Sequence, residues 1–285
     1  MAAVGEAAGP DLLEADWLGA MRRVVAAQRR LLESESGIAD RTVFEGVGEG
    51  GDHSLAIDRR SEDIVFAELE ALHDAGYEFT AVSEERGEVA FGDADGRVVI
   101  DPIDGSLNAR RTLPTFALSV AVASGPSMAD VELGYVYDFG AGEEFCARRG
   151  QGAWRNGAEL EARGPGYGLE LVGIESAKPE LLLPLLGRMT DRVARIRSLG
   201  SVAVSLCYVA AGRFDGMVSS RTCRSVDAAA GQLIVREAGG NVRFGELEAK
   251  AADLGLAARY ELAAALDEEM LHTLLETLPG FSAET

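Results

Sequence analysis

The residues best suited to chemistry in this chain are two aspartates that stand three positions apart after an apolar run, in VVIDPIDGSLN over 98–108. Pro102 forces a bend between Asp101 and Asp104, which can direct both carboxylates and the carbonyl of Ile103 towards one point. Hard oxygen ligands of this kind suit Mg²⁺. Two unpaired carboxylates this close would otherwise repel each other and raise each other's pKa. A solvated Asp-Pro turn with a helix cap is the alternative interpretation.

The residues that follow the two aspartates suit an anion. Gly105 permits close backbone approach, and Ser106 can cap a short helix. The free N–H groups at such a helix start form an anion site. Carboxylates beside an anion site therefore predict a place where Mg²⁺ and a substrate phosphate bind together.

Other acidic residues stand beside predicted elements elsewhere in the chain. Glu84 and Glu85 follow a predicted strand, Asp58 precedes a predicted helix, and Asp227 lies in the first turn of an alanine-rich helix. Each also fits an ordinary role, because first-turn carboxylates interact favourably with the helix dipole and acidic pairs are usually solvated.

Taken together, these segments resemble the inositol monophosphatase family of Mg²⁺-dependent phosphatases, which includes archaeal fructose-1,6-bisphosphatases. The matching segments are AID (56–58), SEE (83–85), DPIDGSLN (101–108), RSLGSVA (197–203) and VDAAAG (226–231). The resemblance runs from about residue 12 to residue 275. It implies αβαβα layers and a phosphomonoesterase that acts on inositol monophosphate, fructose 1,6-bisphosphate or both.

The resemblance also implies a set of metal ligands. Glu85, Asp101 and the carbonyl of Ile103 would hold one Mg²⁺, for which Mn²⁺ could substitute. Asp101, Asp104 and Asp227 would hold a second ion, and Glu85 would touch a weaker third. Such ions polarise a phosphoryl group and lower the pKa of bound water.

The same resemblance gives roles to the residues around the phosphate. Asp58 and the Ser106 hydroxyl would orient and deprotonate the attacking water. Asp104, Gly105 and Ser106 would contact the substrate, with the N–H groups of Gly105 and Ser106 on phosphate oxygens. Positioning and charge neutralisation would supply most of the acceleration, as in phosphoryl transfer generally.

Three positions depart from the family pattern. Ser83 replaces a glycine and Val226 a tryptophan, and Ser220, followed by Arg221, stands where animal-type members often carry an inositol-contacting glutamate. The last departure makes the chain more similar to the archaeal members. We expect Arg197 and Arg221 to contact a second phosphate, and surface ion pairs are the alternative.

Other functions are possible. An aspartyl-phosphate phosphatase would need a D-x-D motif after an apolar strand, which this chain lacks. A 3′-phosphatase acting on adenosine 3′,5′-bisphosphate, as in some relatives, would need aromatic residues over a purine. A non-catalytic regulatory relative is the third alternative, although every expected ligand is present.

The composition limits the partners and the location. The net charge of −20 over 285 residues argues against binding to nucleic acid or to an anionic membrane. No apolar run is long enough to span a bilayer, and the N-terminus lacks the pattern of a signal peptide. Three cysteines without a CxxC pair fit a reducing compartment. We therefore expect a cytoplasmic enzyme, and family habit suggests a homodimer.

The apolar patterns predict a layered fold of the mixed α+β and α/β type. Helical spacing over 12–33 and 59–76 and short strand-like runs between 78 and 149 predict helices on a mostly antiparallel sheet. Strands and helices alternate after residue 169, which indicates α/β layering. We expect an N-terminal subdomain (1–160) with most metal ligands and a C-terminal subdomain (161–285) with Asp227 and the sugar-side residues. The glycine-rich segment 45–52 predicts a mobile loop, because no buried strand precedes it and no helix directly follows.

Overall fold

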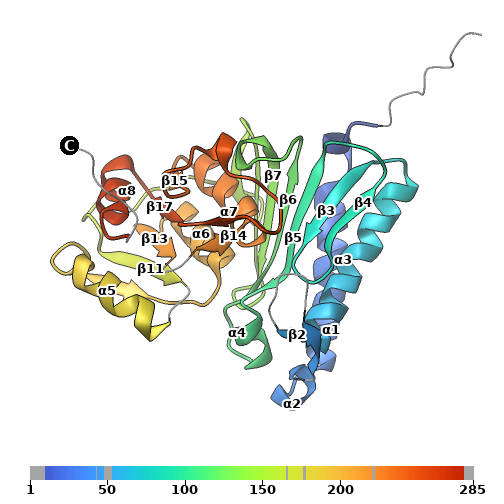
Figure 1. Ribbon diagram of the computed structural model, residues 1–285, viewed down its shortest axis with the longest axis horizontal. Coiled ribbons are helices and arrows are strands. Elements are labelled where there is room, and N and C mark those ends of the chain that lie inside the picture. Colours follow the sequence, from blue (N-terminus) through green and yellow to red (C-terminus); the bar gives the residue numbers. More distant parts are fainter. Residues whose placement is uncertain are drawn as a thin grey trace, which may run out of the picture.

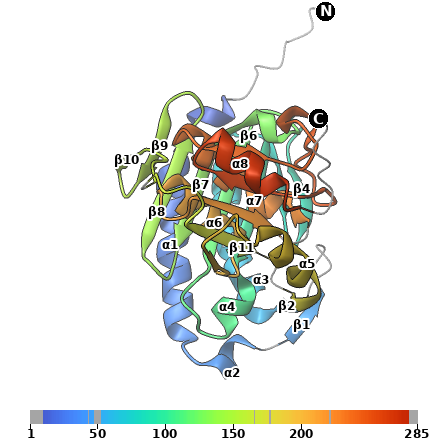
Figure 2. The ribbon, with the colours of Figure 1, turned by 90° about the vertical axis from the view of Figure 1, so that its left-hand side faces the viewer.

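The structure is a computed structural model that describes residues 10–42, 44–47, 53–164, 166–175, 178–219 and 222–278. Its elements form five layers, in the order helices, sheet, helices, sheet, helices (Figure 1). Figure 2, turned by 90°, shows the outermost helices of the second half in front of the other layers. The layered fold class predicted from the sequence is thereby confirmed.

The larger sheet has eight strands in the order β10-β9-β8-β7-β6-β5-β3-β4. Only the β3–β5 pair is parallel among these neighbours. The central strands β5, β6 and β7 are almost wholly buried because helices cover both faces. The strands are β3 (Phe79–Ser83), β4 (Gly87–Phe91), β5 (Arg97–Asp104), β6 (Ala117–Ala123), β7 (Val131–Asp138), β8 (Glu143–Arg148), β9 (Gly152–Arg155) and β10 (Ala158–Leu160).

The outer face of this sheet is covered by α1 (Trp17–Ser34) and α3 (Ala56–Asp74). Asp16 begins α1 by accepting a hydrogen bond from the N–H of Gly19. Apolar side chains at helical spacing, Trp17, Met21 and Val24 among them, are fully or almost fully buried against the sheet. The N-terminal helix thus forms because its apolar stripe has a sheet to cover.

The middle layer holds α6 (Val202–Ala210) and α7 (Ser225–Glu237), between the two sheets. Small residues let α7 approach the first sheet closely. A Cβ atom added at Gly134 on β7 would lie 2.6 Å from the backbone oxygen of Ala230. This close packing sets how far the first turn of α7 reaches towards β5.

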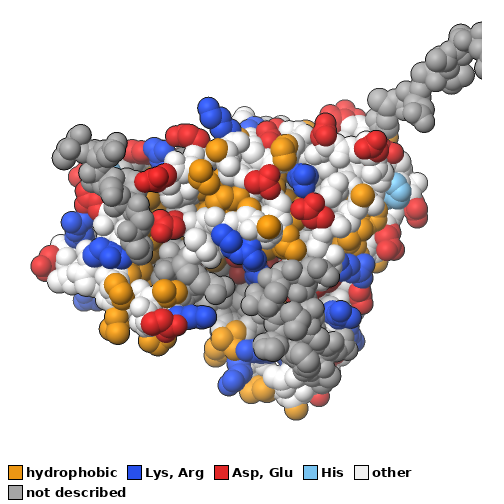
Figure 3. Space-filling view, in the orientation of Figure 1, with side chains coloured by type: hydrophobic (Ala, Val, Ile, Leu, Met, Phe, Trp, Pro, Cys, Tyr) orange, Lys and Arg blue, Asp and Glu red, His pale blue; other side chains and the backbone are white. Residues whose placement is uncertain are grey.

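The second sheet has the order β12-β11-β13-β17-β15, with parallel pairs on one side of β13 and antiparallel pairs on the other. Its outer face carries α5 (Pro179–Met189) and α8 (Glu268–Leu275). The strands are β11 (Leu171–Glu175), β12 (Arg195–Arg197), β13 (Gly216–Ser219), β15 (Asn241–Arg243) and β17 (Ala263–Ala265); β14 (Cys223–Arg224) pairs with β16 (Arg259–Tyr260) apart from this sheet. Exposed apolar side chains gather over α5 and around the short helix α4 (Ser106–Arg110) (Figure 3).

Some elements differ from those predicted. The bend predicted at Pro102 does not end the strand, because β5 continues to Asp104 through a register irregularity against β6. A bulge of this kind accommodates Pro102 inside the strand. The first three residues of the glycine-rich segment 45–52 belong to β1 (Phe44–Val47), which pairs with β2 (His53–Leu55), and α2 (Ile38–Arg41) precedes them. The part of the predicted loop at 48–52 lies outside the described residues.

Packing of α7 on β7 leaves no room for a side chain at Gly134. We expect Gly134→Ala to lower the free energy of unfolding by about 1–3 kcal/mol, as overpacking of a core does. Denaturant unfolding followed by circular dichroism measures this. The matched control is Gly187→Ala on α5, where an added Cβ meets nothing within 4 Å; it should be neutral or slightly stabilising. Equal stability of Gly134→Ala and the parent would contradict the close approach.

Candidate active site

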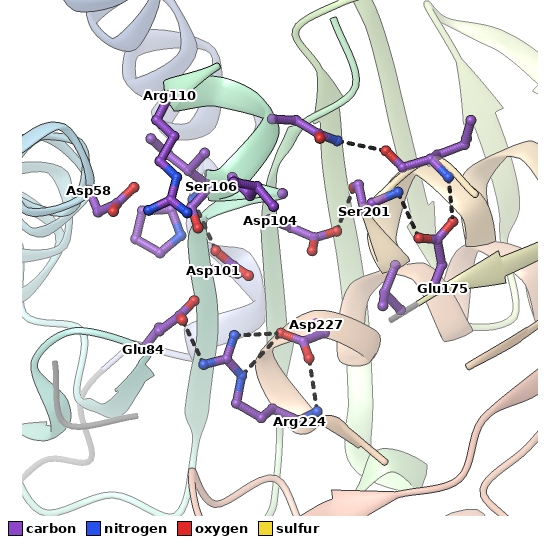
Figure 4. A pocket seen from close by; sticks show the side chains of 18 of the residues that line it. Asp58, Glu84, Asp101, Asp104, Ser106, Arg110, Glu175, Ser201, Arg224 and Asp227 are labelled. Carbon is purple, nitrogen blue, oxygen red and sulfur yellow. Dashed lines mark hydrogen bonds and ion pairs between the residues drawn. The ribbon is translucent and has the colours of Figure 1, made fainter. Parts of the chain in front are cut away.

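A cavity of about 700 Å³ lies where the first sheet and the middle helices meet (Figure 4). Its described walls come from the start of α3, the β3–β4 turn, the end of β5 with α4, the loop before α6, and the start of α7. Segments more than a hundred residues apart in the sequence therefore contribute to one site.

The end of β5 supplies two of the carboxylates. Asp101 and Asp104 are 2% and 7% exposed, and the N–H of Ile103 donates to Asp101 Oδ1 at 3.0 Å. Gly105 begins α4 with φ of 91°, and a Cβ there would lie 3.0 Å from the backbone oxygens of Gly200 and Thr115. Only glycine suits this position, because the backbone is left-handed and closely packed.

Asp104 is held from the opposite wall. The Ser201 hydroxyl and the N–H of Ala203 each donate to Asp104 Oδ2 at 2.6 Å. Both donors belong to the N-terminal turn of α6, where N–H groups lack helical partners and the helix dipole favours a negative charge. The first turn of α6 therefore fixes the orientation of this carboxylate.

Asp227 reaches the same point from α7. One ligand atom each of Asp101, Asp104 and Asp227 can be chosen so that all three lie within 4.8 Å of one another, and all three residues are buried. Asp227 Oδ2 also accepts the backbone N–H of Arg224, which caps the helix start. Three buried acceptor-only groups so close together are the donor set that a divalent cation needs.

Comparisons with known proteins bear on this arrangement. The model of the inositol monophosphatase family matches residues 18–278. The chain belongs to this family. A fructose-1,6-bisphosphatase/inositol-1-monophosphatase of Thermococcus kodakarensis is 35% identical over 240 residues, 82% of this chain and 86% of that protein. The protein of the same description from Methanothermobacter thermautotrophicus is 32% identical over 92% of this chain and 96% of its own length.

Another relative carries a different description, and solved structures share the fold. The Nus factor SuhB of Escherichia coli strain K12 is 36% identical over 65% of this chain and 69% of that protein. The crystal structure of the MJ0109 gene product, an inositol monophosphatase-fructose 1,6-bisphosphatase, superposes with a TM-score of 0.81 at 27% identity, covering 93% of this chain and all of that chain. The inositol monophosphatase TM1415 of Thermotoga maritima gives 0.74 at 28% identity, covering 92% and 98%.

The two other residues expected to act on water also line the cavity of this family member. Asp58 lies in the first turn of α3 and is buried, and Ser106 is the first residue of α4. Figure 4 shows both side chains on the same side of Asp101. Their roles in activating water stay predictions.

Both glutamates of the SEE segment line the cavity, although the sequence assigned a role only to the second. Glu84 acts on Asp101, because burial and then the Glu84 charge contribute most to raising the pKa of Asp101. One Glu85 oxygen, Oε2, is buried and has no hydrogen-bond partner among the described residues. Two adjacent glutamates cannot be told apart in the sequence, because the direction of each side chain depends on the shape of the turn.

The turn that carries these glutamates is anchored from α3. Glu62 is buried, and its Oε1 accepts hydrogen bonds from the Ser83 hydroxyl at 2.5 Å and the Arg86 N–H at 3.1 Å. Ser83 is the residue that departs from the family's glycine, and its hydroxyl is satisfied by this contact. The Arg86 guanidinium lies 4.2 Å from the centre of the Phe66 ring, which further holds the turn against α3.

Glu175 is another residue that the sequence analysis missed. It ends β11, is 1% exposed, and accepts hydrogen bonds from the N–H groups of Leu199 and Gly200 and from the Ser205 hydroxyl. These contacts hold the loop that leads into Ser201. Glu175 therefore positions Asp104 indirectly, through the Ser201 hydroxyl that donates to Asp104. Burial raises the pKa of Glu175 to about 7.

Arg197, one of the two predicted basic residues, does not line the cavity. All three residues of β12, Arg197 included, are exposed on this edge strand, and Arg197 Nη1 donates to the Ile196 carbonyl instead of lining the cavity. Arg221 lies outside the described residues. The described cations that line the cavity are Arg110, Lys178 and Arg224, so the expectation for Arg197 is corrected.

Burial and repulsion between neighbouring carboxylates raise the pKa values of Asp101, Asp104 and Glu84. Burial and the charge of Asp227 raise the pKa of Asp104 to about 7, although Ser201 and Ala203 oppose the shift. Burial raises the pKa of Glu84 to about 8, against the opposing charge of Arg224. Without added cations, this cluster is a cost to the folded state at neutral pH.

The glutamates can be told apart by substitution. We expect Glu84→Gln to weaken Mn²⁺ binding by at least about tenfold, because the substitution removes a negative charge beside Asp101 that attracts the cation. Glu85→Gln is the matched comparison, on the adjacent residue of the same turn. Calorimetric titration of both variants measures the effect. A large loss in Glu85→Gln with none in Glu84→Gln would support the original sequence assignment.

The raised pKa values predict how the metal-free protein responds to pH. The unfolded chain loses its carboxyl protons near pH 4, whereas Asp104 keeps its proton until about pH 7. Stability therefore falls as the pH rises between these values, by at most about 1.4 kcal/mol per pH unit for each such group. Thermal unfolding of the metal-free protein at about pH 5.5 and pH 8 measures this, with Asp104→Asn as the control.

Asp104→Asn should make that pH dependence shallower, and Mg²⁺ should stabilise the parent more at pH 8 than at pH 5.5. A metal-free parent that is more stable at pH 8 than at pH 5.5 would contradict the repulsion among these carboxylates.

Proposed function

We propose that this protein is a metal-dependent phosphomonoesterase that hydrolyses small sugar or cyclitol phosphates, inositol monophosphate and fructose 1,6-bisphosphate in particular. The observation that carries the proposal is the convergence of Asp101, Asp104 and Asp227 within 4.8 Å in one buried cavity. The descriptions of the archaeal relatives, which name both activities, support the choice of substrates.

We expect this group of carboxylates to hold two Mg²⁺ ions, with Mn²⁺ as a substitute. Asp101 would bridge them, Asp104 and Asp227 would complete one site, and the Ile103 carbonyl with a glutamate of the SEE segment would complete the other. When bound, the ions polarise the phosphoryl group and lower the pKa of a water molecule. The protein's own contribution is to hold these oxygen atoms in place before the ions arrive.

The remaining residues act on the water and the phosphate. Asp58 accepts a proton through the Ser106 hydroxyl and so activates the water for in-line attack. The backbone at Gly105 and Ser106 contacts phosphate oxygens, because the left-handed turn at Gly105 brings this backbone to the cavity wall. No covalent intermediate on the protein is needed, since the water displaces the sugar oxygen directly.

Arg110 and Lys178 are better candidates than Arg197 for a second phosphate. Both line the cavity, and the Nε atom of Arg110 is buried with no hydrogen-bond partner among the described residues. A phosphate oxygen would supply that partner. None of the described residues lining the cavity is aromatic, which disfavours a nucleotide substrate that needs stacking over a purine.

The family resemblance and the composition support a proposed location and oligomeric state. We place the protein in the cytoplasm as a homodimer; three cysteines without a disulfide support a reducing compartment. Among the described residues, no helix combines the length and apolar character needed to cross a membrane. The SuhB relatives keep a regulatory role open as a second candidate function.

The proposed function is tested by a substrate panel. We expect Mg²⁺-dependent phosphate release from inositol 1-phosphate and fructose 1,6-bisphosphate, and little from adenosine 3′,5′-bisphosphate. Asp58→Asn should lower kcat by about 10²–10⁴-fold, as loss of a general base does, while Mg²⁺ affinity measured by calorimetry stays close to that of the parent. Absence of turnover of all three esters with Mg²⁺ or Mn²⁺, at low and high salt, would favour the regulatory role.

A further inference from the structure

Arg224 places a fixed positive charge among the carboxylates of the cavity. Its Nη1 atom lies 2.6 Å from Glu84 Oε1, and its Nη2 and Nε atoms lie 3.3 and 3.4 Å from Asp227 Oδ1. The Arg224 side chain is only 15% exposed, as is that of Glu84. Figure 4 shows the guanidinium between these two carboxylates, below Asp101.

The position of this guanidinium is set by the backbone. Arg224 is the N-cap residue of α7, and its own N–H donates to Asp227 Oδ2 at 2.9 Å. Asp227 is therefore held by both the main chain and the side chain of one residue. Each carboxylate oxygen has two lone pairs, so Asp227 can keep these contacts and still offer an oxygen to a metal ion beside Asp104.

The formal charges show what this guanidinium contributes. Glu84, Asp101, Asp104 and Asp227 carry four negative charges when ionised. Two divalent ions balance these four, and Arg224 adds a further positive charge, which opposes the carboxylates of Glu85 and Asp58 that line the same cavity. A third divalent ion on the Glu84 side would meet a guanidinium already bound to that carboxylate, and the two cations would repel each other.

We infer that Arg224 is a permanent cation of the metal centre that takes the place of a third divalent ion, so that the centre binds two exchangeable ions. The inference rests on the proposed function only for the presence of a metal centre. An arginine suits the task because it remains charged at every accessible pH and its planar donors span two carboxylates.

Counting bound Mn²⁺ tests the inference. Metal-free full-length protein is titrated with Mn²⁺, and the bound ions are counted by calorimetry and by the electron paramagnetic resonance signal of free Mn²⁺. We expect two ions in the parent and three in Arg224→Gln, because the vacated Glu84 and Asp227 oxygens then accept an ion. Arg224→Lys keeps the charge and should bind two.

The matched control is Arg213→Gln. Arg213 is also a partly buried arginine with a two-point ion pair, to Glu143, but it does not line the described cavity. This variant should bind two ions. Three ions in the parent, or two in a folded Arg224→Gln, would overturn the inference. Should Arg224→Gln not fold, the count in the parent decides alone: two ions support the inference and three reject it.

This experiment separates the inference from the proposed function, since it uses no substrate. Two ions in the parent and three in Arg224→Gln, without turnover of any ester, would reject the phosphatase and keep the role of Arg224. Three ions in a parent that hydrolyses the esters would reject the role of Arg224 and keep the phosphatase.

Discussion

Repulsion among buried carboxylates is the constraint on which the rest of this structure depends. Asp101, Asp104 and Asp227 stand within 4.8 Å of one another and all three are buried, and the Glu84 charge acts on Asp101 from the adjacent turn. Such a cluster is unfavourable unless cations or hydrogen-bond donors compensate it. The surrounding elements are arranged to supply that compensation.

The layered architecture explains where the compensation comes from. The middle helices α6 and α7 begin at the cavity, so that N–H groups at their first turns donate to Asp104 and Asp227. Close packing against the first sheet, through small residues such as Gly134, brings α7 near enough to reach β5. Glu175 and Glu62 act behind the site, because each holds by hydrogen bonds a loop that carries cavity residues. Rigid layers thus hold like charges together that would separate on a flexible scaffold.

The sequence predicted the segment that carries the two aspartates and most helices and strands. It did not predict how β5 continues past Pro102. The DPIDGS segment indicates a metal and phosphate site by itself, because few other structures or functions require two aspartates, Pro102 and Gly105 in that order. Most helices and strands followed from apolar spacing. The extension of β5 through Pro102 could not be predicted, since a proline usually ends a strand and the bulge depends on pairing with β6.

Side-chain contacts across the fold were the other limit. Glu175 and Arg224 stand in no motif that the sequence analysis used. Glu175 contacts residues 24 and 25 positions away, and Arg224 joins Asp227, three positions away, to Glu84, 140 positions away. Arg197 was expected in the cavity because it lies in a family-like segment, yet strand β12 leaves its side chain exposed. Position along the chain predicted which acidic residues line the cavity, because several segments each carried one. It could not identify which cations face them.

The central claim is that the buried carboxylates form a divalent metal centre. The most direct measurement is anomalous diffraction from crystals soaked in Mn²⁺. The account predicts strong anomalous peaks within about 2.0–2.6 Å of oxygen atoms of Asp101, Asp104 and Asp227, in the range of hard-cation coordination. Well-diffracting crystals at saturating Mn²⁺ with no peak at these carboxylates would contradict it.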